Sequence, residues 1–468
     1  MKSALDGKIF SIVSEEAGKL GFRAFVIGGY VRDWFLQRPC NDIDIVIEGS
    51  GIAVAEAVAR RVKTKVSVFK NFGTAMLHFQ GNEVEFVGAR KESYRADSRK
   101  PIVEDGTLKE DQERRDFTIN ALAFSLQKED FGALVDPFGG IRDLNAGIIR
   151  TPLDPDTTYS DDPLRMLRAI RFATQLGFEI VPESKDSIRR NQERISILSA
   201  ERVADELMKI MKTSKPSRGW MLMDECGLLK HVLPALDALK GVETVGGCAH
   251  KDNFLHSLQV LDNVAAVSDK IWLRWAALLH DVGKAPVKRF EPGTGWTFHG
   301  HEYVGSKMIK GIFGRLKMSQ NDDMKYVQKL VALHLRPIAL VDEVTDSAVR
   351  RLLFDAGDDV DDLMILCKAD ITSKNDRKVE TFRRQYERVK EKLVEVEAKD
   401  AVRNFKNPIT GELVMATYGI PPCREIGEIK EFVKEAILDG VIPNEYEAAL
   451  GLMRRKAVEM GLKPVVEQ

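Results

Sequence analysis

Two aspartates separated by one residue stand at the start of an apolar run, in the segment NDIDIVIEG at 41–49. In an extended strand, side chains at i and i+2 point to the same face, so Asp42 and Asp44 project together. Adjacent carboxylates repel each other unless a cation lies between them, and carboxylate oxygens suit Mg²⁺, which also keeps waters and substrate phosphates. The spacing predicts a magnesium site; the alternative interpretation is an exposed strand end.

The residues upstream favour the metal site. Gly28 and Gly29 lie between a predicted strand and a predicted helix, and Arg32 falls in the first turn of that helix. Backbone N–H groups there can face a phosphate closely, and an arginine adds a charge-assisted contact. A phosphate cradle near a carboxylate pair is what nucleotidyl transfer needs, because a metal helps deprotonate an attacking hydroxyl. Glu85, in NEVEFVG, is a candidate third carboxylate or part of a solvated strand face.

A second group of polar residues recurs every three positions. Asp162, Arg165 and Arg168 therefore share one side of a predicted helix. An aspartate accepts from an exocyclic amine, and an arginine donates to a ring nitrogen or a carbonyl. Cytosine and adenine both present an amine beside an acceptor, so this pair can read either base, whereas uracil and guanine offer mismatched edges. The alternative interpretation is a salt bridge within the helix.

Histidines gather in one part of the chain. Six of the eight lie between 250 and 334: His250, His256, His280, His299, His301 and His334. His280 and Asp281 are adjacent at the end of an apolar run, in LLHDVGK. Imidazole and carboxylate ligands suit Mn²⁺, Fe²⁺, Ni²⁺ or Zn²⁺ better than Mg²⁺. The pattern predicts a second metal site whose chemistry differs from that of the aspartate pair.

Apolar periodicity indicates the elements that position these residues. Up to about residue 155, short β-rich runs (24–29, 42–49 and later KVSVF, AMLHF and EVEFV) alternate with helical stretches such as 51–62. Helical patterns follow, interrupted by a loop with three glycines at 240–252. We expect an α/β head at 1–155, an all-α neck at 156–245, a histidine-rich helical module at 250–375 and a helical tail at 376–468.

Composition limits the class of protein. The chain has 468 residues, 44% hydrophobic and 30% charged, which predicts several globular domains. No apolar run approaches the ~20 residues of a membrane span, and no secretory signal is visible. Five scattered cysteines without C-x-x-C spacing argue against disulfides and thiolate zinc, so we expect a cytoplasmic protein. Because the formal net charge is −1, any polyanion must bind to local patches or metal ions.

Four ordered blocks resemble those of class II tRNA nucleotidyltransferases and the related bacterial poly(A) polymerases. They are GGYVRDWFLQRPCNDIDIV (28–46), RRDFTINALAF (114–124), VDPFGGIRDLNAGIIRTP (135–152) and DDPLRMLRAIRFATQLGF (161–178). The resemblance covers about residues 20–240. It implies a nucleotidyltransferase palm with a mixed β-sheet, followed by a helical neck.

The resemblance also implies roles position by position. Asp42 and Asp44 would hold the catalytic metals, and Gly28, Gly29 and Arg32 would contact the triphosphate. Further nucleotide contacts would come from the later blocks: Arg115, Asp116 and Asn120 at the phosphates and sugar, Asp162 and Arg165 at the base edge, and Arg168 and Arg171 completing the site. One departure is Asp161, which stands where the family usually has glutamate. The segment 95–111 resembles the family's flexible loop, or is an ordinary surface loop.

The histidine-rich module resembles the HD superfamily of metal-dependent phosphohydrolases over about 252–372. The matching pattern is His256, His280-Asp281 and Asp370, and His301 and His334 fit the extra ligands of two-metal members. The resemblance implies removal of terminal or cyclic phosphate from damaged RNA ends, with Lys284 neutralising the phosphate. The alternative is a degenerate module kept for packing or for holding RNA. His250 and His299 match no ligand position.

Together these patterns predict a template-independent enzyme that adds or repairs the 3′-terminal CCA of tRNA with CTP and ATP. The family recognises the tRNA acceptor arm with its neck, body and tail, and FRRQYERVKEKL (382–393) is a candidate RNA-tracking face. Rivals with the same chemistry are a poly(A) polymerase and enzymes that add only CC or only A. Other classes are an HD phosphohydrolase whose head delivers RNA, and a non-catalytic RNA-binding protein.

Overall fold

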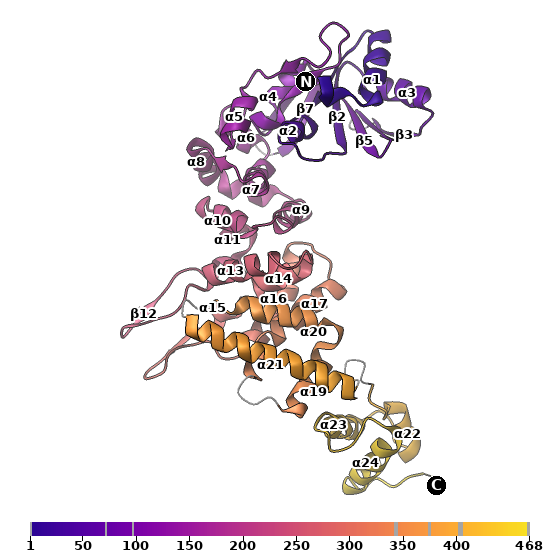
Figure 1. The fold of residues 1–468 in the computed structure, drawn as a ribbon, viewed down its shortest axis with the longest axis vertical. Coiled ribbons are helices and arrows are strands. Elements are labelled where there is room, and N and C mark those ends of the chain that lie inside the picture. The colour runs from indigo at the N-terminus through magenta and orange to yellow at the C-terminus, as the bar shows by residue number, and fades with distance from the viewer. Residues whose placement is uncertain are drawn as a thin grey trace. The chain divides into compact units, whose positions relative to one another are not determined.

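The computed structural model describes residues 2–70, 73–95, 98–340, 345–372, 376–400 and 406–465 (Figure 1). The chain divides into two compact units, Met1–Pro234 and Ala235–Gln468. Among the described helices, none is both long enough and apolar enough to cross a lipid bilayer. The predicted boundaries of the four domains stay predictions.

The first unit is built on a seven-stranded mixed sheet. Its strand order is β3-β4-β5-β2-β1-β8-β9. Strand β2 (Asp42–Glu48) pairs antiparallel with β1 (Arg23–Ile27) and parallel with β5 (Asn82–Gly88). The other strands are β3 (Val66–Phe69), β4 (Thr74–Phe79), β8 (Ala123–Ser125) and β9 (Leu134–Val135). The mixed sheet predicted for the head is therefore confirmed.

Helices α1 (Lys8–Lys19), α2 (Gly29–Phe35) and α3 (Gly51–Val62) accompany this sheet. Helix α3 begins at Ser50, whose Oγ accepts from the N–H of Ala53 and so satisfies an exposed donor. A Cβ on Gly51 would lie only 2.9 Å from the carbonyl carbon of Val87. Glycine therefore lets α3 approach the backbone of β5 closely.

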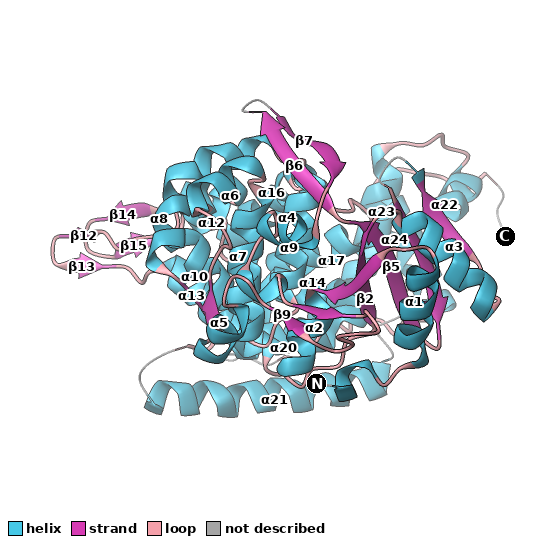
Figure 2. Ribbon diagram, turned by 90° about the horizontal axis from the view of Figure 1, so that it is seen from above, coloured by secondary structure: helices cyan, strands magenta, loops and turns pink. Residues whose placement is uncertain are grey.

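The segment 95–111 differs from the predicted loop. Strands β6 (Arg90–Arg95) and β7 (Ser98–Asp105) pair antiparallel, and α4 (Leu108–Glu113) follows (Figure 2). Residues 96–97 lie outside the described residues. The expectation of an irregular loop was wrong because this polar sequence lacks the apolar alternation by which strands are recognised. Backbone pairing alone defines the hairpin.

Helices predominate in the rest of the first unit, as predicted for the neck, beside a short parallel pair of strands, β10 (Ile148–Ile149) and β11 (Glu179–Ile180). The helices include α6 (Pro155–Asp161), α7 (Leu164–Leu176), α8 (Pro182–Asn191), α9 (Ala200–Met211) and α10 (Ser217–Glu225). Helix α7 packs against both α9 and α10 and buries Leu167, Ile170 and Ala173. A Cβ on Gly219 would lie 2.5 Å from Ile210, so α10 also packs closely on α9.

The second unit is mainly helical. Its histidine-rich module contains α13 (Asn253–Ala265), α14 (Ile271–Leu279), α16 (His301–Arg315), α17 (Asp322–Leu333) and α20 (Val360–Asp370). Helices α14 and α17 pack together, α13 packs against α14 and α20, and α16 packs against α17. The unit also has two short hairpins, which pair β12 (Thr244–Val245) with β13 (Cys248–Ala249) and β14 (Arg289–Glu291) with β15 (Gly295–Thr297).

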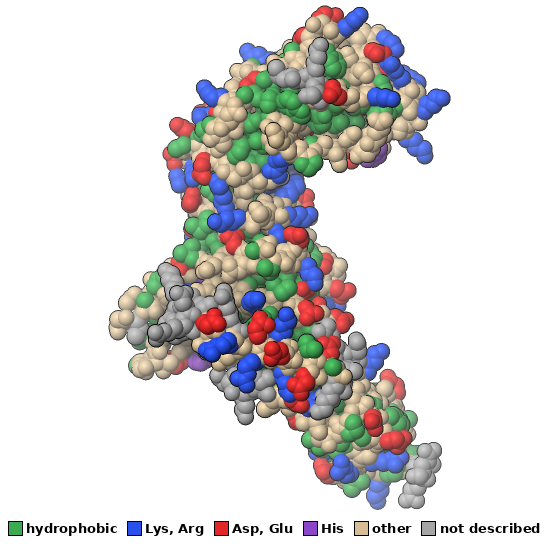
Figure 3. All heavy atoms as spheres, viewed as in Figure 1, with side chains coloured by type: hydrophobic (Ala, Val, Ile, Leu, Met, Phe, Trp, Pro, Cys, Tyr) green, Lys and Arg blue, Asp and Glu red, His purple; other side chains and the backbone are tan. Residues whose placement is uncertain are grey.

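The described tail residues follow the long helix α21 (Asp376–Asp400). Helices α22 (Gly411–Tyr418), α23 (Arg424–Leu438) and α24 (Tyr446–Glu459) surround an apolar cluster of their own, which includes Val414, Val433 and Met453. On the face shown in Figure 3, Lys and Arg side chains lie among Asp and Glu side chains along α21. This mixture agrees with the nearly neutral net charge.

Candidate nucleotide site and metal cluster

Three acidic side chains lie on one face of the sheet in the first unit, on two of its inner strands. Asp42 is exposed and Asp44 half-buried, whereas Ile43 and Ile45 between and after them are buried. The parallel pairing of β2 with β5 places Glu85 directly beside Asp44. Asp42, Asp44 and Glu85, here called the carboxylate edge, therefore come from two neighbouring strands.

The carboxylate edge carries unfavourable negative charge. Burial, followed by repulsion from Asp44 and Glu83, raises the pKa of Asp42. Burial, followed by repulsion from Asp44 and Asp42, raises the pKa of Glu85. Burial also raises the pKa of Asp44, although the Arg115 guanidinium opposes this shift. A hard divalent cation would relieve this repulsion, so these residues fit Mg²⁺.

The turn at Gly28 brings an arginine next to this edge. Gly28 has φ +81°, and a Cβ there would lie 2.9 Å from Nη1 of Arg115 and 3.5 Å from Oδ2 of Asp44. Arg115 is held by its Nε, which donates to Oδ2 of Asp111 at 3.2 Å. Both the backbone conformation and the space therefore require glycine at position 28.

Arg32, a predicted triphosphate ligand, is engaged with the protein. It is only 6% exposed, and its Nε and Nη2 each donate to Asp33 at 2.8 Å. Its Nη1 donates to Oδ1 of Asn120 at 2.7 Å. Asn120 in turn donates through Nδ2 to Oδ1 of Asp116 at 2.9 Å. Direct contact between Arg32 and a phosphate stays a prediction.

Asp116 links this network to α7. Its Oδ2 accepts from Nε of Arg168 at 2.7 Å. Burial would raise the pKa of Asp116, but the Arg168 charge and the hydrogen bond from Asn120 outweigh it and lower the pKa to about 2. Asp116 is therefore a buried anion with both oxygens bonded to neighbouring side chains.

A polar cavity of about 260 Å³ lies beside this network. Its lining residues are mostly arginines: Arg114, Arg115, Asp116, Asp162, Leu164, Arg165, Arg168 and Arg202. Asp162 is extended and precedes α7, so the three residues do not share one helix side as predicted. Asp162, Arg165 and Arg168 nevertheless line one space, here called the arginine-lined cavity. Arg165 donates through Nη2 to the carbonyl oxygen of Arg114 at 2.5 Å, and Asp162 accepts from the N–H of Leu164 at 3.2 Å.

Sequence reasoning missed three residues here. Arg202 of α9 lines the cavity, and Glu206, one turn later, accepts from Nε of Arg171 at 2.6 Å. Buried Phe172 lies under three guanidinium groups, with ring centroids 4.9, 5.4 and 3.8 Å from Cζ of Arg32, Arg168 and Arg171. Only the i, i+4 spacing of Arg202 and Glu206 on a helix offered a sequence signal.

Arg171 does not join the other predicted nucleotide ligands. It lines a neighbouring cavity of about 470 Å³ whose walls also include Arg38, Gln175, Lys209 and Lys212. Its guanidinium bonds Glu206 and Oε1 of Gln175. The structure therefore places Arg171 behind the arginine-lined cavity rather than in its wall.

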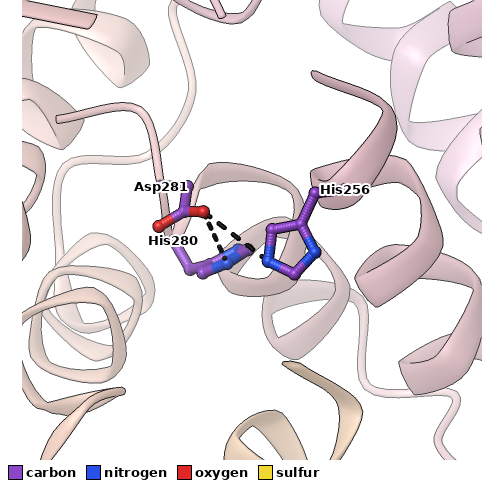
Figure 4. A group of neighbouring side chains, drawn as sticks. All are labelled: His256, His280 and Asp281. Atoms are coloured by element: carbon purple, nitrogen blue, oxygen red, sulfur yellow. Dashed lines mark ion pairs between the residues drawn. The ribbon is translucent and has the colours of Figure 1, made fainter. Parts of the chain in front are cut away.

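In the second unit, the structure brings all six predicted metal ligands together. His256 lies on α13, His280 and His334 follow α14 and α17, His301 begins α16, and Asp370 ends α20. Figure 4 shows three of them, with the carboxylate of Asp281 facing the imidazoles of His256 and His280. We call these six residues the histidine–aspartate cluster.

The two oxygens of Asp281 face different histidines. Oδ2 lies 3.3 Å from Nε2 of His280 and 3.6 Å from Nε2 of His256. Oδ1 lies 3.3 Å from Nε2 of His301 and 3.9 Å from Nε2 of His334. Asp370 adds an oxygen 2.8 Å from Nε2 of His256. The carboxylate of Asp281 therefore separates two groups of ligands.

The ring orientations fit a metal site. Nδ1 of His280, His301 and His334 lies 2.8, 2.9 and 2.7 Å from the backbone carbonyls of residues 277, 298 and 331. A neutral imidazole that donates through Nδ1 keeps its lone pair on Nε2. Those three Nε2 atoms are buried and have no hydrogen-bond partner among the described residues. Carbonyl-fixed imidazoles with buried lone pairs are typical of metal ligands.

The carboxylates of the cluster stabilise a positive charge on one imidazole but not on its neighbour. Burial would lower the pKa of His280, but Asp281 and Asp370 raise it to about 10. Burial, together with the charge on His280, lowers the pKa of His334 to about 4. Despite its burial, the pKa of Asp281 lies well below the usual range because His280 and other cationic neighbours stabilise its charge.

Two lysines flank the histidine–aspartate cluster. Nζ of Lys284 donates to Oδ2 of Asp281 at 2.7 Å. Lys251, which sequence reasoning missed, donates through Nζ to Oγ1 of Thr372 at 2.6 Å and lies 3.1 Å from Nδ1 of His256. His250 and His299 lie outside the ligand groups, as predicted.

Comparisons with known families match three segments. Residues 24–150 match the poly A polymerase head domain, and residues 177–240 match the family described as a probable RNA and SrmB-binding site of polymerase A. Residues 253–375 match the HD domain.

Several curated relatives are similar over most of the chain. The multifunctional CCA protein of Nitrosomonas europaea is 34% identical over 352 residues, which are 71% of this chain and 81% of that protein. The A-adding tRNA nucleotidyltransferase of Deinococcus radiodurans is 32% identical over 74% of this chain and 79% of that protein. The A-adding enzyme of Geobacter sulfurreducens is 32% identical over 72% of this chain, but the match spans only 36% of that longer protein.

Solved structures share the fold. A CCA-adding enzyme with ATP aligns with a TM-score of 0.62 at 23% identity, covering 95% of this chain and 94% of that one. A tRNA nucleotidyltransferase with a primer tRNA and an incoming ATP analogue aligns with a TM-score of 0.56 at 24% identity, covering 81% and 98%.

Proposed function

The chain belongs to the family of tRNA nucleotidyltransferases and related poly(A) polymerases, and from this premise we propose that it adds or repairs the 3′-terminal CCA of tRNA with CTP and ATP. The position of Arg115 carries the proposal. Its guanidinium lies beside Asp44 at the turn of Gly28, and the same side chain lines the arginine-lined cavity. A triphosphate at the carboxylate edge would therefore have its nucleoside next to Asp162 and Arg165.

The proposed roles follow from this geometry. Asp42 and Asp44, with Glu85 beside them, would hold Mg²⁺. When bound, the cation neutralises the triphosphate and lowers the pKa of the RNA 3′-hydroxyl. The hydroxyl oxygen attacks the α-phosphorus in line, and pyrophosphate leaves with the electrons of the broken P–O bond.

The protein side chains supply positioning and selection. Arg115 would bind the triphosphate, and Gly28 and Gly29 leave space for it. Asp162 would accept from the exocyclic amine of cytosine or adenine, while Arg165 would donate to the adjacent acceptor. A network of side-chain hydrogen bonds would fix the sugar and base ends of the site relative to each other. It runs from Arg32 through Asn120 and Asp116 to Arg168. Arg171 would act from behind through Phe172.

The exact product distinguishes this proposal from its rivals. The relatives include both CCA and A-adding proteins, and a cavity that accepts cytosine or adenine serves either. tRNA transcripts that lack one, two or three terminal nucleotides, incubated with CTP and ATP separately and together, separate the rivals by product length. Full CCA on the shortest transcript supports the proposal; A only, CC only or a long A tail replaces it with the corresponding rival.

A second activity is favoured by the buried Nε2 atoms of the histidine–aspartate cluster. We propose that the cluster holds two transition-metal cations, of Mn²⁺, Fe²⁺, Ni²⁺ or Zn²⁺, and hydrolyses phosphate or cyclic phosphate at damaged RNA ends. His256, His280 and Asp370 would form one group and His301 and His334 the other, with Asp281 between them. When bound, such cations lower the pKa of a water and polarise the phosphate.

The flanking lysines, Lys284 and Lys251, would neutralise the phosphate oxygens. Phosphate release from RNA with a 3′-phosphate, measured on protein loaded with each metal in turn, tests this activity. Release by wild type and by Asp44→Asn, but not by Asp281→Asn, supports it, and no release with any metal would refute it. We also propose that the partner is the acceptor arm of tRNA, that the neck and tail contact the RNA, and that the protein is cytoplasmic.

A further inference from the structure

Two β-hairpins of the second unit lie side by side (Figure 2). The first pairs β12 (Thr244–Val245) with β13 (Cys248–Ala249), and the second pairs β14 (Arg289–Glu291) with β15 (Gly295–Thr297). An ion pair between Lys288 and Glu243 joins them. We call residues 243–250 and 288–298 the hairpin lobe.

Aromatic rings gather on the hairpin lobe. Trp296 lies 5.4 Å from Phe290 and 5.1 Å from the ring of His250, which lies 6.0 Å from Phe298. All four side chains are half-buried, so part of each remains open to solvent. His250 is held because its Nε2 accepts from the N–H of Glu243 at 3.1 Å and its Nδ1 lies 2.8 Å from the carbonyl oxygen of Lys251.

Residues at the ends of both hairpins contact the cluster. The carbonyl oxygen of Phe298 lies 2.9 Å from Nδ1 of His301. The ring of Phe298 lies 5.6 Å from Nζ of Lys284, the lysine that donates to Asp281. At the end of the other hairpin, Lys251 contacts His256 and Thr372. The Lys284 side chain therefore lies between the Phe298 ring and the carboxylate of Asp281.

We propose that the hairpin lobe is a nucleobase-stacking platform for the histidine–aspartate cluster. The base of the terminal nucleotide stacks on the exposed parts of Trp296 and Phe298, while Lys251 and Lys284 hold the phosphate that the cluster hydrolyses. The ligand is a nucleoside monophosphate, free or at an RNA end. Because every base offers a π-face, the platform accepts all four bases. The inference rests on the hydrolytic activity proposed above and adds how its substrate is recognised.

Aromatic and cationic side chains together favour nucleotides over other phosphate esters. Stacking on aromatic rings and contacts with cations are the sequence-tolerant means by which proteins bind single-stranded nucleic acid. Lys288, which is paired with Glu243, lies with Nζ 5.3 Å from the Trp296 ring centroid. Ribose phosphate offers no ring to stack, so it uses only the lysines and the cluster.

The test compares Trp296→Leu with Trp296→Phe in the full-length, metal-loaded protein. Steady-state hydrolysis is measured with adenosine 3′-monophosphate, with an RNA oligonucleotide ending in a 3′-phosphate, and with ribose 5-phosphate. Binding of adenosine 3′-monophosphate and of inorganic phosphate is measured by calorimetry. Trp272→Leu is the matched control, because Trp272 is also half-buried but lies at the opposite end of α14 from His280.

For Trp296→Leu we expect KM for both nucleotide substrates to rise on the order of 10-fold, with kcat nearly unchanged, because one stacking contact is lost. Ribose 5-phosphate hydrolysis, phosphate binding and metal content stay at wild-type values, and Trp296→Phe restores nucleotide binding. An equal effect on all substrates, or none, overturns the platform while the hydrolytic activity stands. A phosphopeptide is assayed in parallel, and hydrolysis of it at the same rate as the RNA also overturns the platform. If wild type hydrolyses none of the substrates, the proposed activity itself fails.

A difference between the two nucleotide substrates identifies the source of the ligand. Tighter binding of the oligonucleotide than of the mononucleotide supports an RNA end at the platform. Equal binding supports a free nucleotide. Both results retain the platform, because the Trp296→Leu effect applies to the base in either case.

Discussion

The carboxylate edge and the histidine–aspartate cluster offer two different sets of ligand atoms for divalent cations within one chain. The first offers only oxygen atoms from two neighbouring strands, is partly exposed, and carries raised pKa values caused by burial and repulsion. The second gathers six side chains around Asp281 and buries imidazole lone pairs oriented by backbone carbonyls. Donor chemistry therefore favours Mg²⁺ at the first site and transition metals at the second.

The two regions also differ in how many metal ligands the protein itself supplies. A cation held by the carboxylate edge would have coordination positions left for substrate phosphates, as expected of a site that admits and releases a triphosphate. The histidine–aspartate cluster supplies most ligands itself, so its cations are expected to stay bound between turnovers. Substitutions that affect one site and spare the other test this contrast.

The largest effect is expected from Asp44→Asn. Removing one carboxylate charge weakens cation binding at the edge, and addition of nucleotides to tRNA should fall on the order of 10³-fold, since a bound metal contributes several kcal/mol of transition-state stabilisation. Phosphate release by the other unit should not change. Single-turnover extension of a tRNA transcript measures the first and a phosphate assay the second. Glu56→Gln, an exposed carboxylate on α3, is the control. Addition above one-tenth of wild type would contradict the assignment.

The converse substitution is His334→Ala. It removes a buried imidazole whose Nε2 is directed at the cluster, so the metal content of the purified protein should fall and Mn²⁺ should no longer raise Tm. At a concentration 100 times its Kd, a ligand adds about 2.7 kcal/mol to the free energy of unfolding. The variant should lose a metal-dependent stabilisation of about this size. Nucleotide addition should be retained. His299→Ala, exposed and outside the cluster, should behave like wild type; an equal loss in both variants would refute the ligand role.

A smaller effect is expected from Arg165→Ala. The arginine would donate to the base edge, so its removal should reduce discrimination against UTP and GTP about 10-fold to 100-fold, which corresponds to 1–3 kcal/mol. The affinity for triphosphate, set by Arg115, should change less. Competition between CTP and UTP in single-nucleotide addition measures the ratio. The exposed Arg60→Ala on α3 is the control, and unchanged selectivity in Arg165→Ala would exclude base reading.

The smallest predicted effect concerns stability in acid. Because the pKa of Asp116 is about 2 in the folded protein rather than 3.8, its charge stabilises the fold above pH 4. This contribution, on the order of 2 kcal/mol, should disappear as the pH falls from about 4 towards 2. Urea unfolding of wild type and Asp116→Asn across that range measures it. The difference in the free energy of unfolding between the two proteins should narrow as the pH falls. A constant difference would show that the pairing of Asp116 with Arg168 does not lower the pKa of Asp116.

Local patterns predicted much of this molecule. The strand that carries Asp42 and Asp44, the helix that follows Asp162, and the convergence of six metal ligands all depend on spacing along the chain or on a matched motif. Triphosphate contact by Arg32 stays a prediction, and its bond to Asn120 joins segments 88 residues apart, which local spacing does not encode.

Other features depend on tertiary packing alone. Arg202 and Phe172 join the nucleotide region only because α9 packs on α7 and because three arginines converge on one ring. Lys251 reaches the cluster from a stretch predicted as a loop, although its Gly246-Gly247 turn is a hairpin signal. The hairpin at 90–105 carried no apolar alternation at all.

The most direct test of the account is anomalous diffraction from crystals of the full chain soaked with Mn²⁺ and CTP. We predict metal peaks at Asp42 and Asp44 that require CTP, with the triphosphate beside Arg115 and the cytosine edge at Asp162 and Arg165, and separate peaks at Asp281 that do not require it. Nucleotide bound away from Arg115, or metal at the cluster but none at the aspartate pair in the presence of CTP, would contradict it.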